Sequence, residues 1–154
     1  MKGYTPGLLD RLMNERRDAQ PLTLEQLKDS VARDLEALLN TRIALDAARL
    51  DGFPEARASI LHYGLLDFAG LCLTSSSDRA AVCASIEEAI AVHEPRLREV
   101  KAVLELDAGD VNRLHFAIHA RLNVDGITEA VNFNAVLQPS SLHYDIRKTV
   151  RPRG

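Results

Sequence analysis

The stretch LHFAIHARLNVDGITEAVNFNAVL, residues 114–137, decides the fold. Apolar and polar residues alternate along it, and a period of two is typical of β-strands with one buried face. Asp125 and Gly126 interrupt the alternation with a dipeptide that favours a tight hairpin turn. The stretch therefore predicts two antiparallel strands joined by this turn. The side chains expected to face the core are Leu114, Phe116, Ile118, Ala120, Leu122, Val124, Val131, Phe133, Ala135 and Leu137.

Two further strands are expected on either side of this hairpin. One begins after Pro95, and a short one follows Pro139. One apolar and one polar face are typical of an antiparallel sheet that is covered on one side only. The inward residues expected on these strands are Val100, Ala102, Leu104 and Leu106 on the first and Leu142, Tyr144 and Ile146 on the last.

Upstream of the sheet, the period changes to that of a helix. Thr23 and Gln26 form a capping-box pattern, which predicts a helix from about Leu24 to about Asn40. Asp29 and Arg33 are spaced for an ion pair on the outer face of this helix. The residues expected on its buried face are Leu24, Leu27, Val31, Leu35 and Leu38.

A second helix is expected to start near Ser77 or Asp78. It ends at His93, because Pro95 disfavours helical geometry at Glu94. Residues 41–76 are broken by glycine, proline and serine, and within them residues 60–65 are expected to form a short extended piece.

The fold class that follows is α+β, with two main helices packed on one face of an antiparallel sheet of about four strands. The helices come first and the sheet second. We expect an amphipathic arm at residues 1–22, a single α+β domain at 23–146 and a mobile basic tail at 147–154.

Composition excludes several classes of protein. The chain has 154 residues and a formal net charge of −3, which argues against nucleic acid as the main partner. Cys72 and Cys83 cannot make a disulfide framework, and neither has metal-ligand spacing. No signal peptide and no membrane span are expected from the sequence.

The titratable residues give no catalytic or metal centre. His115 and His119 share a strand face but lie roughly 13 Å apart, too far to hold one ion. No nucleotide, hydrolase or zincin motif is present, so no cofactor is expected. Glu94 could act in glycoside hydrolysis only with a second carboxylate, and the spacing does not choose among the candidates. These candidates are Asp67, Asp107 and Asp110.

The remaining pattern is Glu94-Pro95-Arg96-Leu97, at the junction between the second helix and the first strand. We call these four residues the corner. Proline fixes the backbone there, and the two charges flank it. The charges could pair with neighbours inside the chain, or they could offer a docking point to a partner, and the spacing alone leaves both interpretations open.

With the corner and several other motifs, the sequence resembles the TssE family, the baseplate subunits of bacterial type VI secretion systems. This family is related to the sheath-initiating wedge proteins of contractile-tailed phages. The matching pieces occur in the family's order and cover almost the whole chain. They are LLDRL at 8–12, SVARDLEALLNTR at 30–42, SILHYGLLDF at 59–68, residues 86–97 ending in EPRL, and VNF at 131–133.

The resemblance implies a cytoplasmic, non-enzymatic wedge component that acts at the cytoplasmic face of the inner membrane. The implied baseplate partners are TssF, TssG and TssK. The β-sheet of this chain would bind the first ring of the TssB/TssC sheath. It also points to Glu94, Pro95, Arg96 and Leu97 as partner-docking residues. Exposed strand edges suit such docking, because main-chain hydrogen bonds supply affinity.

Two alternatives stay open. The family is often labelled lysozyme-like, which would make the chain a peptidoglycan hydrolase. An arginine beside the glutamate favours the charged carboxylate, which is the wrong state for a general acid. A small regulatory adaptor that uses the same corner is the third possibility.

Overall fold

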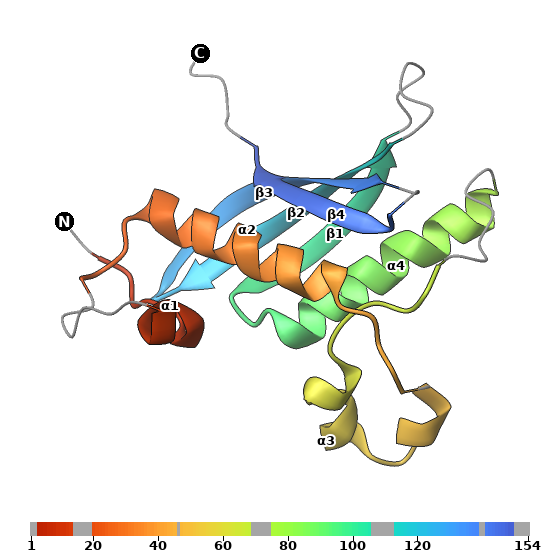
Figure 1. Ribbon diagram of the computed structural model, residues 1–154. Helices are drawn as coiled ribbons and strands as arrows, with labels where there is room; N and C mark the ends of the chain where they lie inside the picture. Colours follow the sequence, from red (N-terminus) through yellow and green to blue (C-terminus); the bar gives the residue numbers. More distant parts are fainter. Residues whose placement is uncertain are drawn as a thin grey trace.

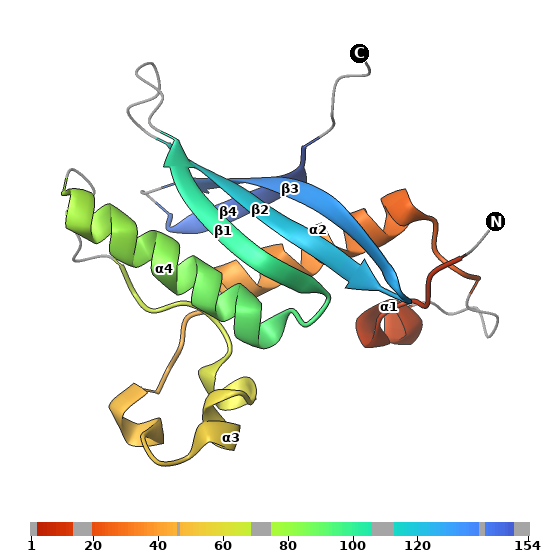
Figure 2. The same cartoon turned by 180° about the vertical axis from the view of Figure 1, so that it is seen from behind.

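The computed structural model describes residues 3–13, 20–45, 47–68, 75–105, 113–138 and 141–149. Figures 1 and 2 show two layers, with two long helices on one face of a sheet and no helix over the other face among these residues. The helices are α1 (Leu8–Met13), α2 (Leu24–Asn40), α3 (Pro54–Arg57) and α4 (Ser76–His93), with the 3-10 turns η1 (Ala47–Leu50) and η2 (Ile60–His62). The strands are β1 (Leu97–Glu105), β2 (Leu114–Val124), β3 (Ile127–Gln138) and β4 (His143–Lys148).

The sheet confirms the expected α+β class, with helices first and sheet second. Its strands follow the order β1-β2-β3-β4, and all neighbours are antiparallel. The β2–β3 hairpin keeps its register from Leu114↔Leu137 to Val124↔Ile127. Asp125 and Gly126 have φ of 52° and 78°, which is the requirement of a type I′ turn. The turn therefore fixes the register that the sequence predicts.

The expected phase of β1 is only partly right. Ala102 is buried as predicted, but Leu97, expected on the opposite side, is also buried. A bulge between Arg98 and Lys101 explains this, because it shifts the register and places Glu99 at φ 51°. One extra residue exchanges the two faces of a strand, so both ends of β1 turn apolar side chains to the core.

Helix α2 has the predicted bounds and the predicted capping box. The Gln26 backbone N–H donates to Thr23 Oγ1 at 3.2 Å, and the Thr23 N–H donates to Gln26 Oε1 at 2.9 Å. The predicted Asp29–Arg33 ion pair is wrong. Asp29 pairs with Lys148 and Arg33 pairs with Asp10, so partners from other segments replace the one on the helix surface.

Helix α4 begins one residue before the expected range and ends at His93 as predicted. The expected extended piece at residues 60–65 is wrong over its first half. Ser59 Oγ accepts the Leu61 backbone N–H and caps the turn η2 instead. Only Leu65 pairs in an extended manner, beside Arg42. Gly64 is required here, because its φ is +124° and a Cβ would lie 2.5 Å from the Thr41 carbonyl oxygen.

The first and the last described segments both contribute to the packed domain. Tyr4 and Leu22 exchange backbone hydrogen bonds, and Tyr4 is buried in the core. At the other end, Lys148 belongs to β4 and forms ion pairs with Glu25 and Asp29 of α2. Cys72, Leu106 and residues 150–154, on which expectations were also placed, lie outside the described residues.

The core lies between the sheet and the two long helices. Helix α4 packs along β1, and α2 packs along β4. The largest fully buried side chains are Tyr144, Phe116, Phe133, Leu27, Leu35, Leu39, Leu65, Ile86, Ile90 and Ile118.

Asn40, at the end of α2, binds β4 in the manner of a neighbouring strand. Its Nδ2 donates to the Tyr144 carbonyl oxygen and its Oδ1 accepts the Tyr144 N–H, both at 2.8 Å. An amide side chain carries the same donor and acceptor as a peptide group, so it can satisfy both backbone groups of one residue. This pair of bonds ties the end of α2 to the last strand.

We expect Asn40→Ala to lower the free energy of unfolding by about 1–3 kcal/mol, because two backbone groups beside the core lose their partners. Asn123→Ala, on the exposed side of β2, is the matched control and should change it by no more than about 0.5 kcal/mol. Urea unfolding of both variants checks this. Equal stabilities would show that water replaces the amide without cost.

Candidate functional site

The corner connects the last turn of α4 to β1. Its backbone is fixed at three points: the Glu94 N–H donates to the Ile90 carbonyl, the Leu97 N–H donates to the Glu94 carbonyl, and the Arg96 carbonyl accepts the Asn123 N–H at 2.8 Å. Pro95 prevents the helix from continuing. The corner thus joins α4, β1 and the end of β2.

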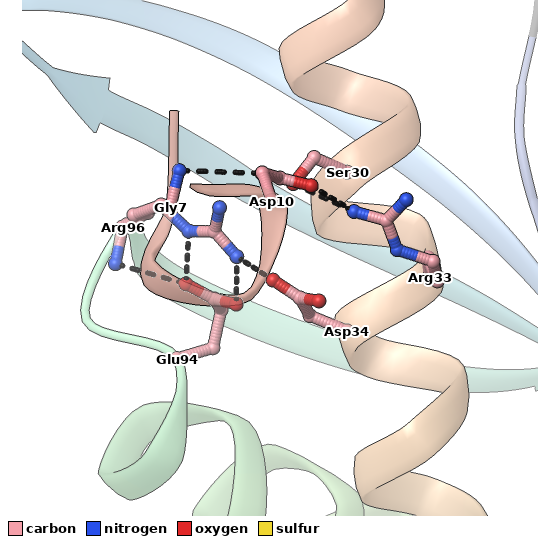
Figure 3. A network of polar contacts seen from close by, with 7 residues as sticks. All are labelled: Gly7, Asp10, Ser30, Arg33, Asp34, Glu94 and Arg96. Atoms are coloured by element: carbon pink, nitrogen blue, oxygen red, sulfur yellow. Dashed lines mark hydrogen bonds and ion pairs between the residues drawn. The ribbon is translucent and has the colours of Figure 1, made fainter. Parts of the chain in front are cut away.

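The two charges of the corner bind each other. Figure 3 shows the edge of the Arg96 guanidinium facing the Glu94 carboxylate, with Nε 2.6 Å from Oε1 and Nη2 2.6 Å from Oε2. The same Nη2 lies 2.5 Å from Oδ2 of Asp34, which comes from α2. The Arg96 backbone N–H adds a weaker bond to Glu94 Oε1 at 3.3 Å. One guanidinium therefore links two carboxylates from two helices.

This network is largely removed from water. The side chain of Glu94 is 6% exposed, that of Arg96 20% and that of Asp34 25%. Burial of the guanidinium opposes its charge, but hydrogen bonds to Glu94 and Asp34 and their negative charges outweigh burial and raise the pKa of Arg96 above its ordinary value. Burial and these same two carboxylates also raise the pKa of Tyr63, which lies near them.

A second polar cluster lies beside the first and holds α1. The Asp10 carboxylate accepts from Ser30 Oγ at 2.6 Å and from the Gly7 N–H at 3.2 Å, and it forms an ion pair with Arg33. Burial opposes the charge of Asp10, but the bonds from Ser30, Arg33 and Gly7 outweigh it and lower the pKa of Asp10. A Cβ on Gly7 would lie 3.6 Å from Nη1 of Arg96, so α1 begins directly over the corner.

Helix α1 turns its apolar residues outward. Its polar residue Asp10 contacts the protein, whereas none of its large apolar side chains is buried. A helix of six residues has little stability of its own, so the Asp10 cluster is what keeps it in place. The exposed fractions are 65% for Leu8, 56% for Leu9, 71% for Leu12 and 74% for Met13. We call these four side chains the α1 face.

The structure places the four predicted docking residues unequally. Glu94 and Leu97 are buried, Arg96 is half-buried and engaged within the chain, and Pro95 is exposed. Sequence reasoning missed Asp34 as the third member. Its signal was its place on α2 between the buried Val31 and Leu35, where a carboxylate at the edge of an apolar face needs a partner.

The structure does not bring the other candidate histidines and carboxylates together into one site. His119 is exposed and bonds Asn132 Oδ1, and the His93 ring lies edge-on to Tyr63. Asp67 is exposed, and Asp107 and Asp110 lie outside the described residues. Over the described ranges, no group of three or more possible ligands could hold a metal ion. In the same ranges, no helix is long and apolar enough to cross a bilayer.

The chemistry available to Glu94 follows from its partners. Both of its oxygens accept hydrogen bonds from the Arg96 guanidinium, so the carboxylate is engaged within the chain. A catalytic carboxyl group must reach the substrate, and glycoside hydrolysis needs two of them facing a groove. The geometry suits a structural ion pair. Beside it lies an exposed apolar surface of a kind that is typical of proteins that bind other proteins.

The fold and this site are of a kind found in proteins that assemble with other proteins. The profile of a family described as baseplate wedge protein gp25 matches residues 25–126, and the chain belongs to this family. A solved chain of "The baseplate complex from the type VI secretion system" is similar, at 17% identity and a TM-score of 0.48, over 74% of this chain and 96% of that one. Comparison with curated proteins gave no match.

We expect Arg96→Ala to lower the free energy of unfolding by about 3–5 kcal/mol, because Glu94 and Asp34 would lose their shared cation in a buried setting. Arg96→Lys should recover only part of this loss, since a point charge cannot bind both Glu94 oxygens and Asp34.

The matched control is Arg121→Ala, which removes an exposed pair with Glu99 at 3.8 Å and should cost no more than about 1 kcal/mol. Urea unfolding of the three variants measures these differences. If Arg96→Ala were no more costly than Arg121→Ala, the network would have no structural role.

Proposed function

We propose that the chain is a non-enzymatic wedge component of a type VI secretion baseplate, which docks to TssF, TssG and TssK and helps to start assembly of the TssB/TssC sheath. Membership of the baseplate wedge family supports the first part. The motifs that resemble the TssE family support the particular secretion system, because EPRL occurs together with the stretches at 30–42 and 59–68. The protein would act in the cytoplasm, at the inner face of the inner membrane.

The observation that carries this proposal is the α1 face lying over the corner. Four large apolar side chains in water are unfavourable for an isolated protein, and they are held outward by a polar cluster. The Arg96 network lies directly beneath and fixes the position of α2, on which α1 is anchored. A partner would therefore meet a preorganised apolar surface, which lowers the ordering cost of binding.

Within this proposal, the corner residues have different roles in docking. Glu94, Arg96 and Leu97 support the surface from inside, and Pro95 is exposed to solvent. The partner of matching chemistry is a baseplate subunit that presents an apolar helix or groove. Arg33, with 56% of its side chain exposed beside α1, would favour carboxylates at the rim of that partner surface.

We expect the double variant Leu9→Ser, Leu12→Ser to bind the purified TssF–TssG complex at least tenfold more weakly than the wild type, because these side chains lose their apolar contact. Its unfolding free energy should change by no more than about 0.5 kcal/mol, since both residues are exposed. Titration calorimetry and urea unfolding measure the two quantities.

Leu61→Ser is the matched control, because Leu61 is a leucine of similar exposure, 51%, on η2. It should bind as the wild type does. Equal affinity of all three proteins would exclude the α1 face from docking. A double variant that lost stability together with affinity would show that α1 belongs to the protein's own core.

The hydrolase alternative makes an opposite prediction. Since Arg96 holds both oxygens of Glu94, we expect the purified protein to leave the turbidity of a peptidoglycan suspension unchanged. Glu94→Gln should give the same trace. Clearing by the wild type that is lost in Glu94→Gln would overturn the non-enzymatic proposal.

A further inference from the structure

The α1 face is too small to be a complete binding surface. Helix α1 has six residues, so it is about 9 Å long and about 10–12 Å wide. A helix of these dimensions supplies only part of the roughly 800 Å² that a specific interface covers on each partner. A partner that binds the α1 face specifically therefore contacts a further surface of this chain.

A second group of exposed apolar side chains lies on the other side of the corner. Residues 47–62 form η1, α3 and η2, and we call them the lobe. Figures 1 and 2 show the lobe and α1 on opposite sides of the C-terminal end of α4. His93, the last residue of α4, donates from Nε2 to the His62 carbonyl oxygen of the lobe at 3.0 Å. Since α1 begins over Arg96, the lobe and the α1 face adjoin the same corner.

A groove lies between the lobe and the outer face of α4, and we call it the lobe groove. Its apolar lining comes from Ile43, Ala47 and Leu66 on the lobe side and from Ala89 and Val92 on α4. Leu66 is 47% exposed and Val92 41%, so the open part of the lining is apolar as well. The cavity volume is about 80 Å³, roughly half of the 150 Å³ or so that holds a benzene molecule. This space fits a single aliphatic side chain.

The walls of the lobe groove are held in place within the chain. Backbone hydrogen bonds join the segments that lead into and out of the lobe. The Ile43 N–H donates to the Leu65 carbonyl oxygen, and the Leu65 N–H donates to the Thr41 carbonyl oxygen, both at 2.9 Å. The His93 ring lies edge-on to Tyr63, with centroids 5.2 Å apart, and fixes the wall from the α4 side. A preformed groove lowers the ordering cost of binding.

An ion pair spans the lobe groove from α3 to α4. Arg57 Nη2 lies 3.6 Å from Glu88 Oε1, and both residues line the groove. Their side chains are 44% and 61% exposed, so the pair is weak and can separate at little cost. An incoming side chain therefore meets a polar rim around an apolar floor, which is typical of anchor sites at protein interfaces.

We propose that the lobe groove is a second anchor site for the TssF–TssG complex, and that its occupant is one aliphatic side chain on a helix of that complex; this rests on the docking role proposed above for the α1 face. Two observations favour this occupant: the α1 face is small, and the groove lies next to it across the corner. A helix laid over the exposed Pro95 would reach both surfaces. Leu61, the control residue for the α1 face, does not line this groove.

The first test removes the apolar lining. We expect the double variant Leu66→Ser, Val92→Ser to bind purified TssF–TssG at least tenfold more weakly than the wild type, because the inserted side chain loses its apolar contacts. The matched control is Leu61→Ser, Val103→Ser, which makes the same changes outside the groove at residues that are each 51% exposed. It should bind as the wild type does. Titration calorimetry measures the affinities, and urea unfolding should give the two double variants equal midpoints.

The second test fills the space and keeps it apolar. Ala47→Leu places a longer side chain in the groove, and Ala48→Leu makes the same change one residue further on, outside the groove lining. We expect Ala47→Leu to weaken TssF–TssG binding at least fivefold, because the inserted side chain loses its room, and Ala48→Leu to leave binding unchanged. Tighter binding by Ala47→Leu would show apolar contact without insertion and would refute the anchor site.

The outcomes separate this inference from the docking role itself. A wild type that does not bind TssF–TssG refutes both. If Leu9→Ser, Leu12→Ser weakens binding and the groove variants do not, the groove is no anchor site and docking through the α1 face stands. Groove variants that bind TssF–TssG normally, but lose TssK or break up a dimer of this chain, give the groove another occupant and refute this one. Should a groove variant fail to fold, hydrogen exchange of the wild type replaces it: TssF–TssG should protect the amides of residues 59–66, and unchanged exchange there refutes the inference.

Discussion

The contact on which the rest of the structure depends is the guanidinium of Arg96 between Glu94 and Asp34. It joins the end of α4 to the middle of α2, the two long helices that lie over the sheet. A single planar cation can bind two carboxylates at once only if both lie near its plane, so the contact sets distance and orientation together. A buried ion pair of this kind adds little net stability compared with apolar side chains in the same place. It does favour one arrangement of the two helices, because any other arrangement would bury a charge without its partner.

From that contact the position of the α1 face follows. Ser30 and Arg33 lie on the same turns of α2 as Asp34, and they hold Asp10. Fixing α2 therefore fixes α1, although α1 makes no buried apolar contact of its own. Glu94 and Arg96 of the corner thus act inside the protein, and the surface that they support, the α1 face, is apolar. In the docking role proposed above, these charged residues would act without touching the partner.

How much the sequence could predict depends on the range of each signal. The bounds of α2 and the β2–β3 hairpin were predictable, because Thr23 with Gln26 and Asp125 with Gly126 act within a few residues. The partners of Arg96 and Arg33 were not, because Asp34 lies 62 residues from Arg96, and Asp10 lies 23 residues from Arg33. The bulge at Glu99 was missed for a related reason. A non-glycine residue at positive φ leaves no compositional mark, and only the packing of both Leu97 and Ala102 requires it.

The placement of the helices follows from what a four-strand sheet leaves unsatisfied. A short open sheet has two rows of unpaired backbone groups, and each long helix lies along one of them, as Figure 2 shows. Helix α2 meets β4 with an amide, a carboxylate and, just beyond its end, a guanidinium, which together match donors and acceptors. Helix α4 meets β1 with the carboxylate of Glu87, which accepts the Ala102 N–H. A helix that offers both kinds of group takes the place of a neighbouring strand, whereas one that offers an acceptor satisfies a backbone donor only. The two helices are alike in length and position, and the difference between the two edges therefore comes from a few side chains.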